Sequence, residues 1–123
     1  MELSVVIPLF NEEHLVDDLI ERTTGVLKGI TADFELIIVD DGSKDKTLAC
    51  LLEARKSDTR IKILELSKNF GHQAAFTAGL AFSKGRFIVM MDGDLQDPPE
   101  LIPVMYRMLL TEEYDVIYGK RIN

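Results

Sequence analysis

The sequence has few of the features that mark secreted, disulfide-bonded or membrane-spanning proteins. Cys50 is the single cysteine among 123 residues, so no internal disulfide can form and a reducing compartment is expected. The N-terminus has no basic segment followed by an apolar run, so no secretory signal is predicted. No apolar run reaches the ~20 residues of a transmembrane helix, so none is expected in this chain. The expected location is the cytoplasm, with the cytoplasmic face of a membrane as the alternative.

Motifs of several common enzyme classes are also missing. No Gly-x-x-x-x-Gly-Lys-Ser/Thr segment occurs, which argues against a P-loop kinase or ATPase. No Gly-x-Gly-x-x-Gly follows the first predicted strand, which argues against a dinucleotide-dependent oxidoreductase. His14 and His72 have no partner at zinc-ligand spacing, and Ser43 has no obvious histidine partner for hydrolase chemistry. His72 stands near the predicted site described below, where a polar contact to a ligand is open to it.

Acidic residues outnumber basic residues by 21 to 14, which gives the chain a formal net charge of −7. This balance argues against nucleic acid as a partner, because nucleic-acid binding depends mainly on Lys and Arg side chains that neutralise phosphates. A diphosphate ligand would likewise need a cation beside it. Hydrophobic residues make up 46% of the chain, enough for the core of one modest domain or of part of a larger one.

Five short apolar runs alternate with four segments of helical periodicity. The predicted strands cover residues 3–7, 34–39, 61–66, 87–91 and 114–118, and the predicted helices cover residues 11–30, 45–55, 73–82 and 98–109. Asn11 is predicted to cap the first helix, and Asp97, just before Pro98, the fourth. This order predicts an α/β domain with a mainly parallel sheet and helices on both faces. The chain ends close to the last predicted strand, so we expect part of a larger domain.

The most informative segment joins the fourth predicted strand to the fourth helix. Asp92, Asp94 and Gln96 follow the apolar run 87–91 at alternate positions, so an extended chain turns their oxygens to one side. Ligands of open α/β sheets bind at this carboxyl end of the strands, and oxygen ligands suit Mg²⁺ or Mn²⁺. We interpret the segment as a metal site that holds a diphosphate; the alternative is an ordinary surface turn. Arg121, after the last strand, can pair with phosphate or remain solvated.

Polar or conformationally special residues also follow the other predicted strands. Asp40 and Asp41 can accept hydrogen bonds from a nucleobase or a ribose. The alternative is a turn in which Asp40 or Ser43 caps the next helix. Phe10 can stack on a base or pack against the first helix. Gly71 can let the backbone approach a ligand closely, or it can simply end a turn.

Three segments of the chain match motifs of one known enzyme family. They are Val5-Val-Ile-Pro-Leu-Phe-Asn-Glu12, Ile38-Val-Asp-Asp-Gly-Ser-x-Asp-x-Thr47 and Asp92-x-Asp94. Together they resemble the family-two glycosyltransferases, which have the GT-A fold. The most similar subgroup is the polyprenyl-phosphate (dolichyl- or undecaprenyl-phosphate) sugar transferases, on the strength of Asn69-Phe-Gly-His-Gln-Ala74, Met91-Asp-Gly-Asp-Leu-Gln-Asp-Pro-Pro99 and Gly119-Lys-Arg121. The resemblance implies that residues 1–123 are the Rossmann-like, nucleotide-sugar-binding half of a catalytic domain whose acceptor-binding half is missing.

The resemblance also implies roles for individual residues. The nucleotide-binding set would be Asp41, at the base, with Pro8, Phe10, Glu12, Asp40 and Gly71 around the nucleoside. The ligands of Mg²⁺ or Mn²⁺ and of the donor diphosphate would be Asp92, Asp94 and Gln96. The catalytic set would be Asp92, Asp94 and Arg121, with the arginine near the phosphates.

The implied reaction transfers a sugar from a UDP- or GDP-sugar to a polyprenyl phosphate or a saccharide, with inversion at the anomeric carbon. A polyprenyl phosphate is already anionic and needs no strong catalytic base, and this sequence offers no convincing one. The main alternative is a sugar-1-phosphate nucleotidyltransferase, for which a Gly-rich, basic loop after the first strand is expected; Pro8-Leu-Phe-Asn-Glu12 is neither. A non-catalytic nucleotide-sugar-binding fragment is a further alternative. The oligomeric state is left open, a homo-oligomer included.

Overall fold

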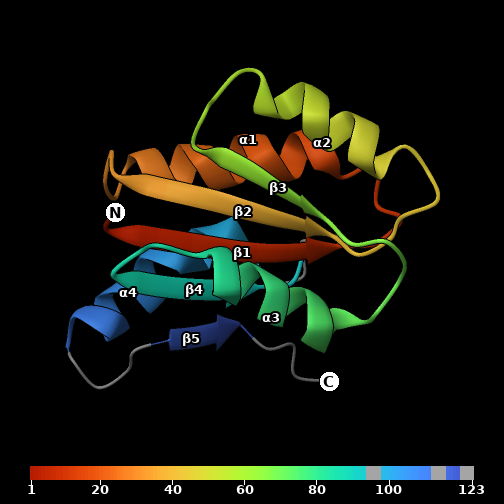
Figure 1. The fold of residues 1–123 in the computed structure, drawn as a ribbon. Helices are drawn as coiled ribbons and strands as arrows, with labels where there is room; N and C mark the ends of the chain where they lie inside the picture. The colour runs from red at the N-terminus through yellow and green to blue at the C-terminus, as the bar shows by residue number, and fades with distance from the viewer. Residues whose placement is uncertain (94–97, 112–115, 120–123) are drawn as a thin grey trace.

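The computed structural model describes residues 1–93, 98–111 and 116–119, and these residues form a five-stranded sheet flanked by helices (Figure 1). The strands are β1 (Leu3–Leu9), β2 (Phe34–Asp40), β3 (Ile61–Glu65), β4 (Phe87–Met91) and β5 (Val116–Gly119). Their order across the sheet is β3-β2-β1-β4-β5, and every neighbouring pair is parallel. The prediction of a parallel sheet is therefore confirmed.

The helices lie on both faces of the sheet, as predicted. They are α1 (Val16–Lys28), α2 (Thr47–Arg55), α3 (His72–Phe82) and α4 (Ile102–Leu110), with the 3₁₀ turn η1 (Pro99–Leu101) before α4. In Figure 1, α3 lies in front of the sheet and α4 lies behind it. None of the helices in the described part of the chain is both long enough and apolar enough to cross a bilayer.

Alternating residues of the central strands fill two separate cores. Val5 and Ile7 of β1 face the larger core, which they share with side chains from α1, α2 and α4. Val6, between them, faces the smaller core with Ala75 and Phe76 of α3. All residues of β1 and β2 are buried, because helices cover both sides of these strands. This explains why both strands read as largely apolar runs.

The first helix begins later than the sequence predicts. Asn11 was expected to be its N-cap, but α1 starts at Val16 and Leu15 occupies the N-cap position without a side-chain hydrogen bond. Asn11 instead has a φ of 52° and its polar groups bond to another loop, described below. The prediction was wrong because the partners of Asn11 lie more than 30 residues away in the sequence. For the fourth helix, the expected cap Asp97 lies outside the described residues.

A buried carboxylate organises the amino ends of the strands. Glu35 of β2 is fully buried and accepts hydrogen bonds from Ser4 Oγ at 2.6 Å and from Lys62 Nζ at 2.7 Å. It also accepts the backbone N–H of Lys84 at 2.6 Å, and Ser4 Oγ in turn accepts the N–H of Gly85 at 2.8 Å. Burial alone would raise the pKa of Glu35, but these donors outweigh it and lower the pKa below its ordinary value. The cluster fixes the entry to β4 at the edge opposite the candidate site.

The direction in which the chain adds strands to the sheet changes at β1. The chain proceeds from β1 to β2 and β3 on one side, whereas β4 and β5 lie on the other side of β1. In open α/β sheets such a switch point leaves a crevice between the two loops that leave in opposite directions, and ligands bind there. In this protein the crevice lies between the loop after β1 and the segment after β4.

Candidate functional site

The loops that follow β1 and β2 are joined by hydrogen bonds into one wall. The N–H of Asn11 donates to Ser43 Oγ at 2.9 Å, and Asn11 Oδ1 accepts the N–H of Lys44 at 2.8 Å. The N–H of Glu12 donates to Thr47 Oγ1 at 2.9 Å. The left-handed backbone of Asn11 makes this double contact possible, and asparagine adopts that conformation more readily than most residues. We call residues 10–13 and 43–47 the loop clasp.

Asp45 secures the loop clasp at the start of α2. Its carboxylate accepts the N–H of Thr47 at 2.9 Å and the N–H of Glu13 at 3.3 Å. Desolvation would raise the pKa of Asp45, but the hydrogen bonds from Thr47 and Glu13 prevail and lower the pKa below its ordinary value. The sequence suggested Asp40 or Ser43 as the capping residue. Asp40 Oδ1 instead accepts the N–H of Ser43 at 3.2 Å, within a local turn.

The carboxylate of Asp41 holds the loop that precedes α3. Asp41 is buried, with 1% of its surface exposed. Its Oδ1 accepts the N–H of Phe70 at 2.8 Å, and its Oδ2 accepts the N–H of Gly71 at 3.0 Å and an Nδ2 hydrogen of Asn69 at 3.3 Å. Gly71 has a φ of 97°, and α3 begins at the next residue. Asp41 therefore determines where α3 begins relative to β2.

Gly42 brings the loops after β2 and β3 into backbone contact. It has a φ of 72°, and a Cβ atom at this position would lie 2.2 Å from the carbonyl carbon of Lys68. Only glycine fits such an approach.

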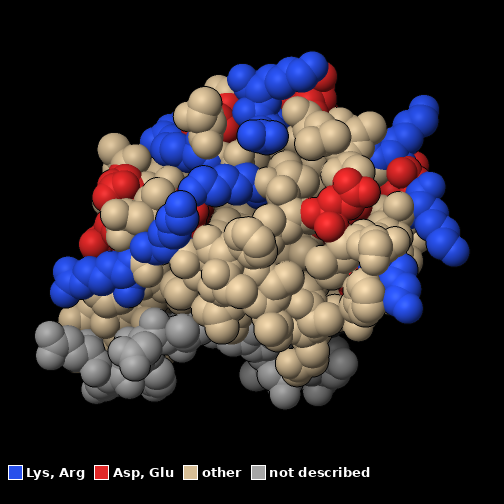
Figure 2. Space-filling model, in the orientation of Figure 1, with Lys and Arg blue, Asp and Glu red and all other residues tan. Residues whose placement is uncertain are grey.

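Figure 2 shows basic side chains along the edge at which the strands of Figure 1 end, and the exposed lysines of these loops are Lys44, Lys46 and Lys68. In a chain of net negative charge, they make this edge more attractive to an anion.

A pocket of about 250 Å³ lies at the switch point of the sheet. Its lining comes from the β1 side and the β4 side together: Pro8, Leu9, Phe10, Glu12, His72, Asp92 and Gly93. Phe10 is 37% exposed and so offers part of its ring to the pocket. Gly93 is buried against β1, since a Cβ there would lie 2.2 Å from a methyl carbon of Leu9. This close packing brings Asp92 next to the loop after β1.

Asp92 and His72 are neighbours in the lining of this pocket. Nδ1 of His72 lies 3.3 Å from Oδ1 of Asp92, and the side chains are 63% and 15% exposed, respectively. The Oδ1 atom itself is buried. One oxygen of Asp92 is thus shielded from solvent, while the side chain still lines the pocket. The sequence placed His72 near the site but did not identify its contact with Asp92, because that contact joins α3 to the end of β4.

The donor chemistry of the pocket suits a hard divalent cation. Asp92 and Glu12 contribute carboxylates to the same small cavity, and carboxylate oxygens are preferred ligands of Mg²⁺ and Mn²⁺. Within the described residues, no group of three His, Cys, Asp or Glu side chains is arranged to hold a metal ion. Two of the three predicted metal ligands, Asp94 and Gln96, lie outside those residues. Of the three predicted metal ligands, Asp92 is thus the one in the described part of the site, and its carboxylate suits such an ion.

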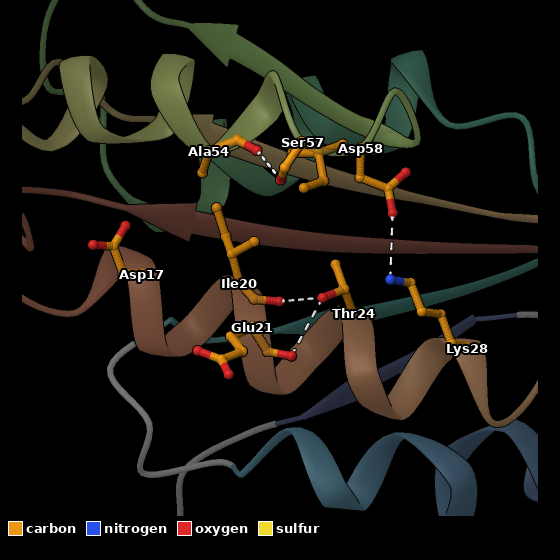
Figure 3. Close-up of a pocket in the computed structure, with 9 residues that line it drawn as sticks. Asp17, Ile20, Glu21, Thr24, Lys28, Ala54, Ser57 and Asp58 are labelled. Carbon is orange, nitrogen blue, oxygen red and sulfur yellow. Dashed lines mark hydrogen bonds and ion pairs between the residues drawn. The ribbon is translucent and has the colours of Figure 1, made fainter.

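The described surface also has hollows outside this pocket. One of about 360 Å³, at the ends of β2 and β3, includes Asp40, Gly42 and Asn69 and adjoins the loop clasp. Another, also about 360 Å³, lies between α1 and α2 and contains no predicted site residue (Figure 3). In it, Lys28 Nζ lies 4.0 Å from an oxygen of Asp58.

The structure brings part of the predicted site together. Four predicted residues line the switch-point pocket: Pro8, Phe10, Glu12 and Asp92. Three lie in the adjoining loops and are engaged in loop structure: Asp40, Asp41 and Gly71. Three lie outside the described residues: Asp94, Gln96 and Arg121. Asn69, which bonds to Asp41 and lines the hollow beside the loop clasp, begins one of the motifs quoted above, but the sequence assigned it no role.

Comparison with known proteins matches residues 4–123 to the model of glycosyl transferase family 2. The chain is 45% identical to a dodecaprenyl-phosphate galacturonate synthase of Rhizobium johnstonii, over 100% of this chain and 37% of that protein. It is 42% identical to an undecaprenyl-phosphate 4-deoxy-4-formamido-L-arabinose transferase of Photorhabdus laumondii, over 99% of this chain and 38% of that protein. The chain thus spans well under half the length of these relatives.

A solved structure supports the fold assignment independently. Glucosyl-3-phosphoglycerate synthase of Mycobacterium tuberculosis, in complex with Mn²⁺, UDP and glucosyl-3-phosphoglycerate, superposes with a TM-score of 0.72. The two sequences are 28% identical, and the match covers 91% of this chain and 40% of the other. Together with the strand order, this likeness confirms the prediction of a mainly parallel α/β sheet of the GT-A fold.

Proposed function

The chain belongs to glycosyl transferase family 2, and on this premise we propose that it binds the nucleotide-sugar donor of an enzyme that glycosylates a polyprenyl phosphate. One observation carries the proposal. Asp92, at the end of β4, and the loop Pro8–Glu12, at the end of β1, line a single pocket at the switch point of the sheet. The named relatives that act on polyprenyl phosphates supply the acceptor class.

The nucleoside of the donor is proposed to lie along the loop clasp. Phe10 presents an exposed aromatic face, which suits stacking against a base. Pro8 and Glu12 line the same pocket, and Asp40 lies at the end of β2 beside it. Asp41 is proposed to lie beneath the base, where its buried carboxylate holds the N–H groups of Phe70 and Gly71 beside the nucleoside.

The diphosphate of the donor is proposed to bind through a divalent cation at Asp92, Asp94 and Gln96. The cation would neutralise the leaving nucleoside diphosphate as a Lewis acid. The chain's own carboxylates in the pocket repel a diphosphate, so these residues bind the donor only by sharing the cation with it. Arg121 is proposed to pair with the phosphates, because a guanidinium group forms two parallel hydrogen bonds with phosphate oxygens.

The proposed transfer proceeds with inversion at the anomeric carbon. The phosphate oxygen of the acceptor is anionic at neutral pH, so it attacks without a protein base. Such an acceptor is a membrane lipid, and the reaction is therefore placed at the cytoplasmic face of a membrane. The rival assignment, a sugar-1-phosphate nucleotidyltransferase, gains nothing from the loop after β1, which is bonded to the loop after β2 and is neither Gly-rich nor basic.

The proposal is tested by sugar transfer from labelled UDP- and GDP-sugars, with Mn²⁺, to undecaprenyl phosphate in detergent. Labelled lipid that forms with the wild-type chain and not with Asp92→Asn supports the full proposal. Donor and Mn²⁺ binding without lipid labelling identifies the 123-residue chain as a donor-binding module only. Absence of any metal-dependent donor binding contradicts the assignment of the site.

A further inference from the structure

We propose that His72 is a positioning residue of the cation site, which holds one oxygen of Asp92 and so directs the other oxygen to the metal. The inference deepens the proposed function and rests on it. His72 does not itself bind the metal in this arrangement. Nδ1 of His72 lies 3.3 Å from Oδ1 of Asp92, and both residues line the switch-point pocket.

The burial of the Asp92 carboxylate supports separate roles for its two oxygens, one beside His72 and the other at the metal. Oδ1 is buried, whereas the side chain as a whole is 15% exposed. In the proposed arrangement, a cation that enters the pocket binds the carboxylate through Oδ2. Carboxylates that ligate metals are commonly held by an additional polar partner, which fixes their orientation. His72 is placed to be that partner.

The position of His72 is set by three features of the surrounding structure. Asp41 holds the backbone N–H groups of Phe70 and Gly71, the two residues that precede His72 in the chain. The positive φ of Gly71 then turns the chain into α3. The imidazole also meets the ring of Phe76 edge-on, with 6.5 Å between the centroids. Phe76 is buried in the smaller core, so this contact ties the imidazole to a fixed point. The buried Asp41 thus acts on the cation site through His72.

A second histidine provides a matched control. His14 Nε2 lies 4.0 Å from an oxygen of Glu12, which also lines the pocket. His14 is 73% exposed and is not part of the pocket lining. Replacement of His14 removes an exposed imidazole beside a pocket carboxylate without altering the contact with Asp92. Its effect on the site should therefore be small.

The test measures Mn²⁺ affinity of the whole 123-residue chain by calorimetry and by electron paramagnetic resonance, without a sugar donor. His72→Ala is expected to weaken Mn²⁺ binding about 10–100-fold, the usual cost of losing the partner of a metal ligand. His72→Asn is expected to remain within roughly threefold of wild type, because its amide N–H can stand close to the position of the lost Nδ1–H. His14→Ala should match wild type, and the melting temperatures of all these variants should be similar.

The outcomes separate this inference from the proposed function. If Asp92→Asn leaves the Mn²⁺ affinity unchanged, the cation site itself is wrongly assigned. If Asp92→Asn abolishes binding while His72→Ala binds as wild type does, only the role of His72 is overturned. Tighter Mn²⁺ binding by His72→Ala would also overturn it, since His72 would then compete with the cation for Asp92. Should His72→Ala fail to fold, the Mn²⁺ affinities of His72→Asn and His72→Gln are compared instead. The amide of glutamine lies one bond further out, so His72→Gln should bind Mn²⁺ more weakly than His72→Asn; equal affinities would overturn the role of His72.

Discussion

Oδ1 of Asp41, at the end of β2, accepts the backbone N–H of Phe70 at 2.8 Å and thereby ties the center of the sheet to the loop before α3. The second oxygen of the same carboxylate accepts the next N–H along this loop. A buried anion thus holds the two residues that lead into α3, a helix whose N-cap, Gly71, makes no side-chain cap hydrogen bond. Four predictions follow from this and the other contacts.

Asp41→Asn should destabilise the protein, because the new amide N–H would face a backbone N–H in a buried position. The expected loss in free energy of unfolding is about 1–3 kcal/mol, typical of an unsatisfied buried donor. Urea unfolding at neutral pH measures it. Asp33→Asn is the control, because the Asp33 side chain is 63% exposed and contacts the N-terminal ammonium group. Equal stability of the two variants would show that the loop does not depend on Asp41.

Glu35 should make the stability of the protein depend on pH. Its pKa is lowered in the folded state. Its contribution is therefore complete above the unfolded pKa, near 4.5, and is lost as the pH falls through the folded pKa. Glu35→Gln should cost about 1–3 kcal/mol at neutral pH, because an amide N–H would replace one of the buried oxygens that accept hydrogen bonds from Ser4, Lys62 and Lys84. It should also flatten the decline of stability below about pH 5. Unfolding by urea at a series of pH values tests both effects, with the exposed Glu53→Gln as control.

Replacement of glycine by alanine should have opposite effects at two positions. Gly42→Ala should destabilise the protein by about 1–3 kcal/mol, because its φ of 72° and the nearby backbone of Lys68 both exclude a Cβ atom. Gly25→Ala should stabilise it by about 0.5–1 kcal/mol, because Gly25 lies within α1 and a Cβ there meets no atom within 4 Å. Thermal unfolding distinguishes the two. The same sign for both variants would contradict the close approach described at Gly42.

A nucleoside diphosphate should raise the melting temperature only when Mg²⁺ or Mn²⁺ is present. At a concentration of 100 times its dissociation constant, the ligand adds about 2.7 kcal/mol to the stability of the native state. Asp94→Ala should remove this metal-dependent shift and leave the melting temperature of the ligand-free protein unchanged. Asp18→Ala, at an exposed position of α1, should retain the shift. A full shift in Asp94→Ala would reject the assignment of that residue to the metal.

The sheet was predictable from the sequence because periodicity is a local property. The buried strands around Val5 and Ile38 read as largely apolar runs, and the intervening helices show their own period. The start of the first helix was not predictable in the same way. Asn11 with two glutamates after it has the composition of a helix start, but its hydrogen-bond partners are in the loop after β2. Local preference gave way to a contact between distant segments.

The same distinction applies to the candidate site. The meeting of Asp92 with Pro8 and Phe10 was predictable, because the carboxyl ends of parallel strands share one edge. The partners of Asp41 and the contact between His72 and Asp92 were not, because they depend on how the loop before α3 lies across that edge. Nothing in the spacing of residues encodes that placement.

The loop clasp has a consequence for the thermodynamics of ligand capture. Its backbone groups around Asn11 and Thr47 already have their hydrogen-bond partners in the ligand-free chain. The conformational entropy of these segments is therefore lost when the protein folds and not when a ligand arrives. Association with a nucleotide should be correspondingly less opposed by chain ordering on this side of the crevice, in the manner of a preorganised receptor.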